Sequence, residues 1–94
     1  EPYKAFFSDY YIIQFNEDND VLDPWMEAVE RVTVNGEEFE KTDYITLYGY
    51  KTYGVRSADK QFCIGNASFE VGETYHVVVE AEGYETLTFD IVAE

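Results

Sequence analysis

The chain has 94 residues with 20 acidic and 6 basic side chains, which gives a formal net charge of −14 at pH 7. The length is that of one domain and the hydrophobic fraction of 46% is enough for one core, so a two-domain enzyme and a disordered tail are excluded. Because the charge repels phosphates and anionic lipid headgroups, and no apolar run is long enough to cross a bilayer, we expect neither nucleic-acid binding nor membrane insertion.

Residues 1–94 are expected to form a single module of a larger protein. The sequence starts at Glu1 without an initiator methionine or a secretion-signal pattern. We expect this module to be monomeric within its multidomain chain. Cys63 is the only cysteine, which excludes an intramolecular disulfide framework and a cysteine-based zinc cluster.

The first elements in chain order are a strand and a short helix. In residues 11–15 the odd positions are apolar, as in a half-buried strand, and the acidic stretch 16–20 ends that strand. The helix is expected to begin with Asp23 as its N-cap and Pro24 at its first position. Trp25 would then anchor the helix on the sheet.

A β-hairpin is predicted over residues 31–39. Asn35-Gly36 supplies the two positive-φ positions that a type I′ turn requires. The remaining expected strands are 44–50, 53–57, 61–64, 67–71, 75–82 and 86–92. Such a series of short strands with regular turn signals predicts an all-β fold with one short helix, specifically a small antiparallel immunoglobulin-like β-sandwich.

Three stretches of the sequence carry a resemblance to a known family. They read YYIIQF followed by an acidic turn, PWMEAVERVTVNGEEF, and YHVVVEAEGYETLTFDIV. In order and spacing they resemble the haemoglobin-interacting domain family, small β-modules of Gram-positive surface proteins related to the streptococcal haem receptor domain. The similarity covers about residues 10–93. It implies an extracellular module, on the bacterial cell surface or secreted, with a protein partner of the haemoglobin type.

Four tyrosines are the candidate partner-binding residues: Tyr44, Tyr48, Tyr50 and Tyr53. Exposed tyrosine rings give contact area and a hydroxyl at little entropic cost, while the alternative is a tyrosine-rich strand packed under a loop. Tyr44 and Tyr48 also have the spacing of a phenolate pair that ligates haem in some surface carriers. Random placement of nine tyrosines in 94 residues gives about 0.8 such pairs, so haem is not expected as a cofactor.

The acidic stretch is the candidate calcium site. Asn16, Asp18 and Asp20 occupy positions 1, 3 and 5 of a calcium-loop pattern, with Glu27 at position 12. The pattern fails at position 6, where Val21 replaces the required glycine. A calcium site of another type, formed by Asn16, Asp18 and Asp20, stays open. The alternative is that this stretch is an exposed polar connection without a ligand.

Catalysis is not expected. His76 and Cys63 are the single histidine and the single cysteine, and a nucleophile pair would require them to meet in space. The sequence has no phosphate-binding loop, nucleophile elbow or zinc-ligand spacing. We therefore expect a non-catalytic extracellular binding module. Two alternatives stay open: a structural spacer or stalk domain without its own ligand, and a carbohydrate-binding accessory module.

Overall fold

A computed structural model describes residues 2–4, 10–42, 50–65 and 67–93 of the chain. In these residues eight strands form one sheet in the order β1-β2-β6-β5-β4-β3-β7-β8. The strands are β1 (Pro2–Lys4), β2 (Tyr10–Gln14), β3 (Val29–Val34), β4 (Glu37–Lys41), β5 (Thr52–Arg56), β6 (Gln61–Gly65), β7 (Thr74–Ala81) and β8 (Leu87–Val92). The helix α1 (Asn19–Ala28) and the short 3-10 helix η1 (Ser57–Asp59) complete the described elements.

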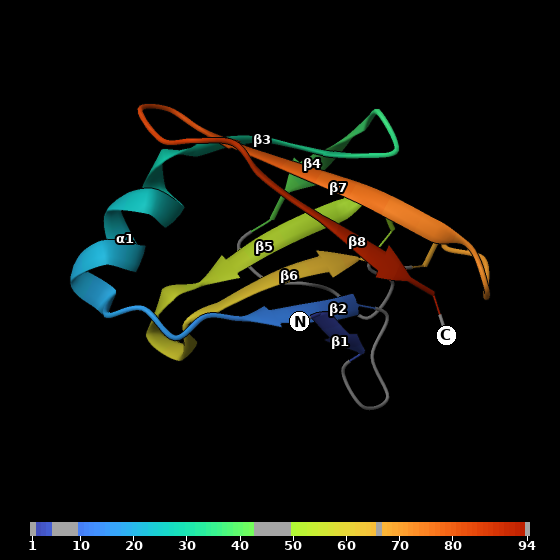
Figure 1. Ribbon diagram of the computed structural model, residues 1–94, viewed down its shortest axis with the longest axis horizontal. Helices are drawn as coiled ribbons and strands as arrows, with labels where there is room; N and C mark the ends of the chain where they lie inside the picture. Colours follow the sequence, from blue (N-terminus) through green and yellow to red (C-terminus); the bar gives the residue numbers. More distant parts are fainter. Residues whose placement is uncertain (1, 5–9, 43–49, 66, 94) are drawn as a thin grey trace.

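The sheet curls so that its two halves face each other, with α1 at one end (Figure 1). β4 joins the halves, because its first part pairs antiparallel with β3 and its last part pairs parallel with β5. The predicted all-β fold with one short helix is confirmed. The immunoglobulin-like sandwich is not confirmed, and its purely antiparallel pairing is wrong. The reason is that Glu40 and Lys41 extend β4 far enough to pair with Thr52 and Tyr53 of the other half.

The core lies between the two halves of the sheet. Its buried members are Tyr11, Ile13, Val29, Val32, Val34, Phe39, Tyr53, Phe62, Ile64, Val77, Val79, Ala81 and Ile91. The alternation expected for 75–82 and 86–92 is confirmed, because Val77, Val79 and Ile91 point inward with almost no exposed surface. β7 alternates buried and more exposed residues, as a period of two predicts, whereas β6 buries consecutive residues from Phe62 to Gly65 and so has both faces covered.

Helix α1 begins earlier than the sequence predicts. Asp18, and not Asp23, is the N-cap, and its carbonyl accepts the backbone N–H of Leu22 at 2.9 Å. Pro24 therefore lies inside the helix, where it lacks a backbone donor. Leu22 and Met26 are both buried and lie one turn apart, so the apolar burial gained by the longer helix offsets this loss.

The predicted hairpin is confirmed and is tied to the neighbouring strand. Asn35 and Gly36 have φ values of 49° and 84°, the left-handed conformation of a type I′ turn between β3 and β4. The Asn35 side chain accepts the backbone N–H of His76 at 2.7 Å, and the Asn35 N–H donates to the His76 carbonyl at 2.8 Å. The turn thus also fixes its position against β7.

The strand predicted at 67–71 is wrong. Its described residues form turns before β7, in which the Glu73 N–H donates to the Glu70 carbonyl at 3.1 Å. The apolar side chain of Phe69 stacks on Tyr75 at 3.9 Å between ring centroids, so it makes a ring contact and not a strand pairing. The strand predicted at 44–50 lies outside the described residues except for Tyr50.

Candidate functional site

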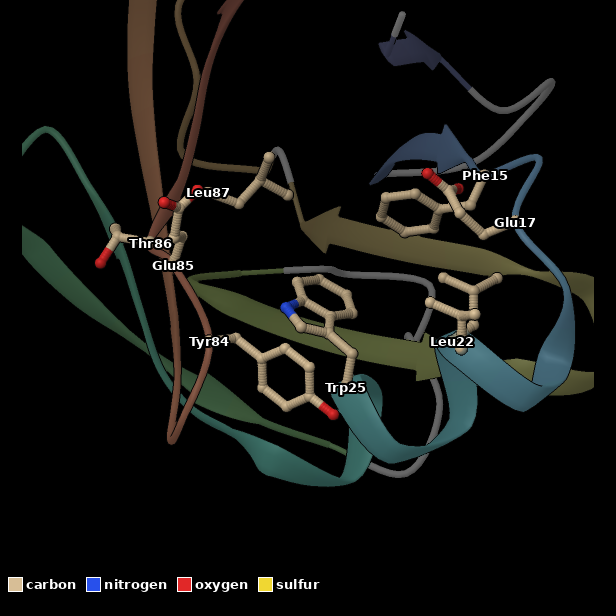
Figure 2. Close-up of a pocket in the computed structure, with 9 residues that line it drawn as sticks. Phe15, Glu17, Leu22, Trp25, Tyr84, Glu85, Thr86 and Leu87 are labelled. Atoms are coloured by element: carbon tan, nitrogen blue, oxygen red, sulfur yellow. The ribbon is translucent and has the colours of Figure 1, made fainter.

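An open apolar groove lies between α1 and the turn that joins β7 to β8 (Figure 2). Its volume is about 490 Å³. The apolar and aromatic residues that line it are Phe15, Val21, Leu22, Trp25, Tyr84 and Leu87, and we call it the tryptophan groove. Concave, mostly apolar surfaces with a few polar groups at the edge are typical of binding sites.

Trp25 is held firmly at the floor of the tryptophan groove. The indole contacts the edge of Phe15, with ring centroids 5.5 Å apart and planes at 70°, and it lies 6.2 Å from the ring of Phe62 in the core. α1 supplies Trp25 at its middle, while Phe15 follows directly after β2. The predicted role of Trp25 as the anchor of the helix is confirmed, since its ring links α1 to the core.

Tyr84 and Val21 form the accessible sides of the groove. Tyr84 is 46% exposed and Val21 is 58% exposed, values that are high for large apolar side chains. Gly83, at a φ of 83°, lets the chain turn there, and the Tyr84 N–H donates to the Ala81 carbonyl at 3.0 Å. Figure 2 shows the Tyr84 ring beside the Trp25 indole.

The charge at the groove is negative on both sides. Glu17 lines it from the segment between β2 and α1, and Glu85 lines it from the turn between β7 and β8. Both carboxylates belong to exposed residues. No lysine or arginine is among the described residues that line the groove. This surface therefore combines an apolar floor with an acidic residue on each of two sides.

A second hollow of about 350 Å³ lies at the opposite end of β7, beside Tyr75 and the β3–β4 turn. Here Lys51 Nζ donates to Glu37 Oε2 at 2.7 Å and lies 5.3 Å from the centroid of the Tyr50 ring. The hydrogen bond that Lys51 donates to Glu37 raises the pKa of Lys51 above its ordinary value. The Lys51 ammonium group is thus already paired with Glu37, so it is less available to bind a ligand.

The structure separates the tyrosines that the sequence grouped together. Tyr50 is exposed at 59%, at the end of the molecule opposite the tryptophan groove. Tyr53 is buried in the core at 3% exposure and stacks on Phe62 at 5.6 Å between centroids. Its ring is therefore not at the surface. Tyr44 and Tyr48 lie outside the described residues. Partner binding by these four tyrosines stays a prediction. Among those that the structure describes, Tyr50 is the one with an exposed ring.

The acidic stretch is divided between a connection and the helix. Asp18 occupies the N-cap position of α1 without a side-chain capping hydrogen bond, and Asp20 lies in the first turn, where a carboxylate is favourable next to the positive end of the helix dipole. Asn16 precedes them, and its N–H donates to Glu17 Oε1 at 3.2 Å. In the described ranges, no group of three His, Cys, Asp or Glu side chains is placed to hold a metal ion. Two of the three proposed calcium ligands thus lie at the start of α1, and calcium binding by them stays a prediction.

The single histidine and the single cysteine lie in different environments. His76 is exposed on β7, and its Nδ1 lies 2.7 Å from Oδ1 of Asp90 on β8. Cys63 is fully buried on β6. A nucleophile pair formed by these two residues is therefore not present in this arrangement.

Comparison with known proteins identifies the family. The sequence matches, over residues 2–92, the family described as "Heme-binding protein Shr-like, Hb-interacting domain". The chain belongs to this family. The resemblance in its three stretches is thereby confirmed, and the match includes both sides of the tryptophan groove. The search of curated proteins gives no match. Within the described residues, α1 and η1 are both too short to cross a membrane.

The tryptophan groove is not predicted by the sequence as a site. The sequence predicts Trp25 as the anchor of the helix and does not predict that Tyr84 lines a site. One feature of the sequence could have indicated the site: Tyr84 is an aromatic residue next to a glycine in a connection, where few core contacts are expected. Because the sequence predicts a helix start at Asp23, it does not predict that Val21 and Leu22 belong to α1.

Proposed function

We propose that this domain is a non-catalytic binding module that captures a folded protein of the haemoglobin type. The observation that carries the proposal is the family match over residues 2–92, whose description names haemoglobin as the interacting protein. The tryptophan groove supports it, because accessible aromatic side chains beside a rigid floor are the groups that dominate protein interfaces.

The groove chemistry favours capture of the protein over capture of free haem. A porphyrin carries two propionates at neutral pH, and Glu17 and Glu85 would repel them. Tyr84 carries the phenol hydroxyl of the described lining, which contains no histidine, cysteine or methionine to ligate iron. A globin surface instead offers apolar and basic side chains.

The proposal includes a location outside the cell, at the surface of a bacterium or secreted from it. Haemoglobin is met outside the bacterial cell, so a module that captures it must be displayed there. The high negative charge supports this, since it keeps a module of 94 residues soluble and unaggregated when displayed.

Two parallel titrations test the proposal. The purified domain is mixed with haemoglobin and the mass is followed by light scattering, while a second sample is titrated with free haem and followed by visible absorbance. We expect a complex with haemoglobin and no spectrum of bound haem. If neither ligand gives a signal, the proposal fails and the spacer alternative gains support. A haem spectrum without a haemoglobin complex would also contradict it.

A further inference from the structure

The tryptophan groove has a lining that defines the chemistry of its occupant. We propose that it binds a polypeptide segment in which one large apolar side chain lies between lysine or arginine residues. This inference rests on the proposed function and adds to it the contact surface and the kind of segment that is recognised.

The apolar part of this segment follows from the floor and sides of the groove. The space of about 490 Å³ is open to solvent above Trp25 and is bordered by Tyr84 and Val21, which are 46% and 58% exposed. An apolar side chain that enters would remove these surfaces from water, which is the main driving force of association. Because Phe15 and Phe62 already fix the indole, little side-chain freedom is lost on binding.

The basic part of the segment follows from the charge on both sides. Glu17 and Glu85 border the apolar floor from two different connections, and the whole chain carries a net charge of −14. Cations placed on either side of the inserted side chain would face one carboxylate each. Acidic segments and porphyrin propionates would be repelled there.

The second hollow, beside Tyr75 and the β3–β4 turn, lacks this combination. At the far end of β7, Glu37 already binds Lys51 at 2.7 Å, so the carboxylate that lines that hollow is neutralised by the protein itself. Eight strand residues, roughly 25 Å, separate the two ends of β7. Charge complementarity therefore assigns a basic apolar segment to the tryptophan groove and not to that surface.

Trp25 provides the signal for the test, because it is the only tryptophan in the chain and lies in the groove. Its fluorescence is followed while the full domain is titrated with the capped peptide Lys-Lys-Leu-Lys-Lys. Two matched peptides replace the leucine by serine or all lysines by glutamate. None of them contains an aromatic residue. We expect a saturable change with the first peptide, binding at least about threefold weaker with the serine peptide, and no saturation with the glutamate peptide.

Charge variants distinguish binding of the peptide to the groove from non-specific attraction to the overall negative charge of the domain. The double variant Glu17→Gln/Glu85→Gln should weaken binding of the leucine peptide by at least about threefold. The matched double variant Glu70→Gln/Glu73→Gln removes the same charge from exposed residues before β7 and should leave binding unchanged. Equal loss in both variants, or equal binding of the leucine and serine peptides, would overturn the inference.

Haemoglobin binding of the same variants separates this inference from the proposed function. If haemoglobin binds the wild type and the Glu17→Gln/Glu85→Gln variant equally while the peptides do not saturate, the groove is not the contact surface and the proposed function stands. If the leucine peptide saturates as expected and haemoglobin does not bind, the groove chemistry stands and the proposed function fails.

Discussion

At the residue scale, Tyr53 shows how burial changes the role of a side chain. It lies at 3% exposure against Phe62, and burial, aided by the nearby charge of Glu38, raises the pKa of its phenol above the ordinary value of 10.0. The folded state therefore keeps this proton at a pH where the unfolded chain loses it. The resulting stability is complete below about pH 10 and is lost as the pH rises through the folded pKa.

A substitution of Tyr53 tests this linkage. In urea unfolding at pH 8 and pH 11, we expect the free energy of unfolding of the wild type to fall more between the two pH values than that of Tyr53→Phe. The variant Tyr50→Phe, which changes an exposed ring, should behave as the wild type does. A Tyr53→Phe variant with the same loss at high pH as the wild type would contradict a buried, proton-retaining phenol.

At the element scale, the β3–β4 turn depends on the backbone conformation of Gly36. Its φ is 84°, and an added Cβ would meet no atom within 4 Å, so a substitution here costs conformational energy without a clash. We expect Gly36→Ala to lower the free energy of unfolding by roughly 1–2 kcal/mol, measured by urea unfolding. Gly36→Asn should cost less, because asparagine tolerates this region better. Equal losses for the two variants would show that the conformation does not determine the stability of the turn.

The sequence predicted those elements that depend on local rules. Alternation along residues 75–82 and 86–92 and the Asn35-Gly36 dipeptide each act within a strand or a turn, and the structure confirms them. The helix start was missed because Pro24 suits a first position, whereas the burial of Leu22 decided the outcome. Local preference was overridden by tertiary packing in that case.

The parallel pairing of β4 with β5 and the position of the groove could not be predicted in the same way. Both depend on how the sheet curls, which brings together segments far apart in the sequence. Trp25 and Tyr84 line the same groove because the chain turns at Gly83 after the end of β7. No sequence motif at either residue indicates that the two line one groove.

At the scale of the whole molecule, the net charge of −14 opposes the compact state. The described ion pairs of Arg31 are exposed and long, at 3.9 Å to Glu38 and 3.8 Å to Glu80, so salt removes little stability from them. We therefore expect the melting temperature at pH 7 to rise as sodium chloride increases from 10 to 200 mM, by screening of the repulsion. Near pH 4.1, where the net charge is about zero, the rise should disappear. A fall at pH 7 would mean that attractive pairs outweigh the repulsion.

Calorimetric titration of two tyrosine variants tests whether the domain captures haemoglobin through the tryptophan groove. Tyr84 and Tyr50 are 46% and 59% exposed and lie at opposite ends of β7, so either can be truncated without opening the core. We expect Tyr84→Ala to bind haemoglobin about tenfold more weakly than the wild type, as loss of a central aromatic contact does, with an unchanged melting temperature. Tyr50→Ala should bind as the wild type does. Full affinity in Tyr84→Ala together with lost affinity in Tyr50→Ala would instead place the haemoglobin contact at the far end of the domain.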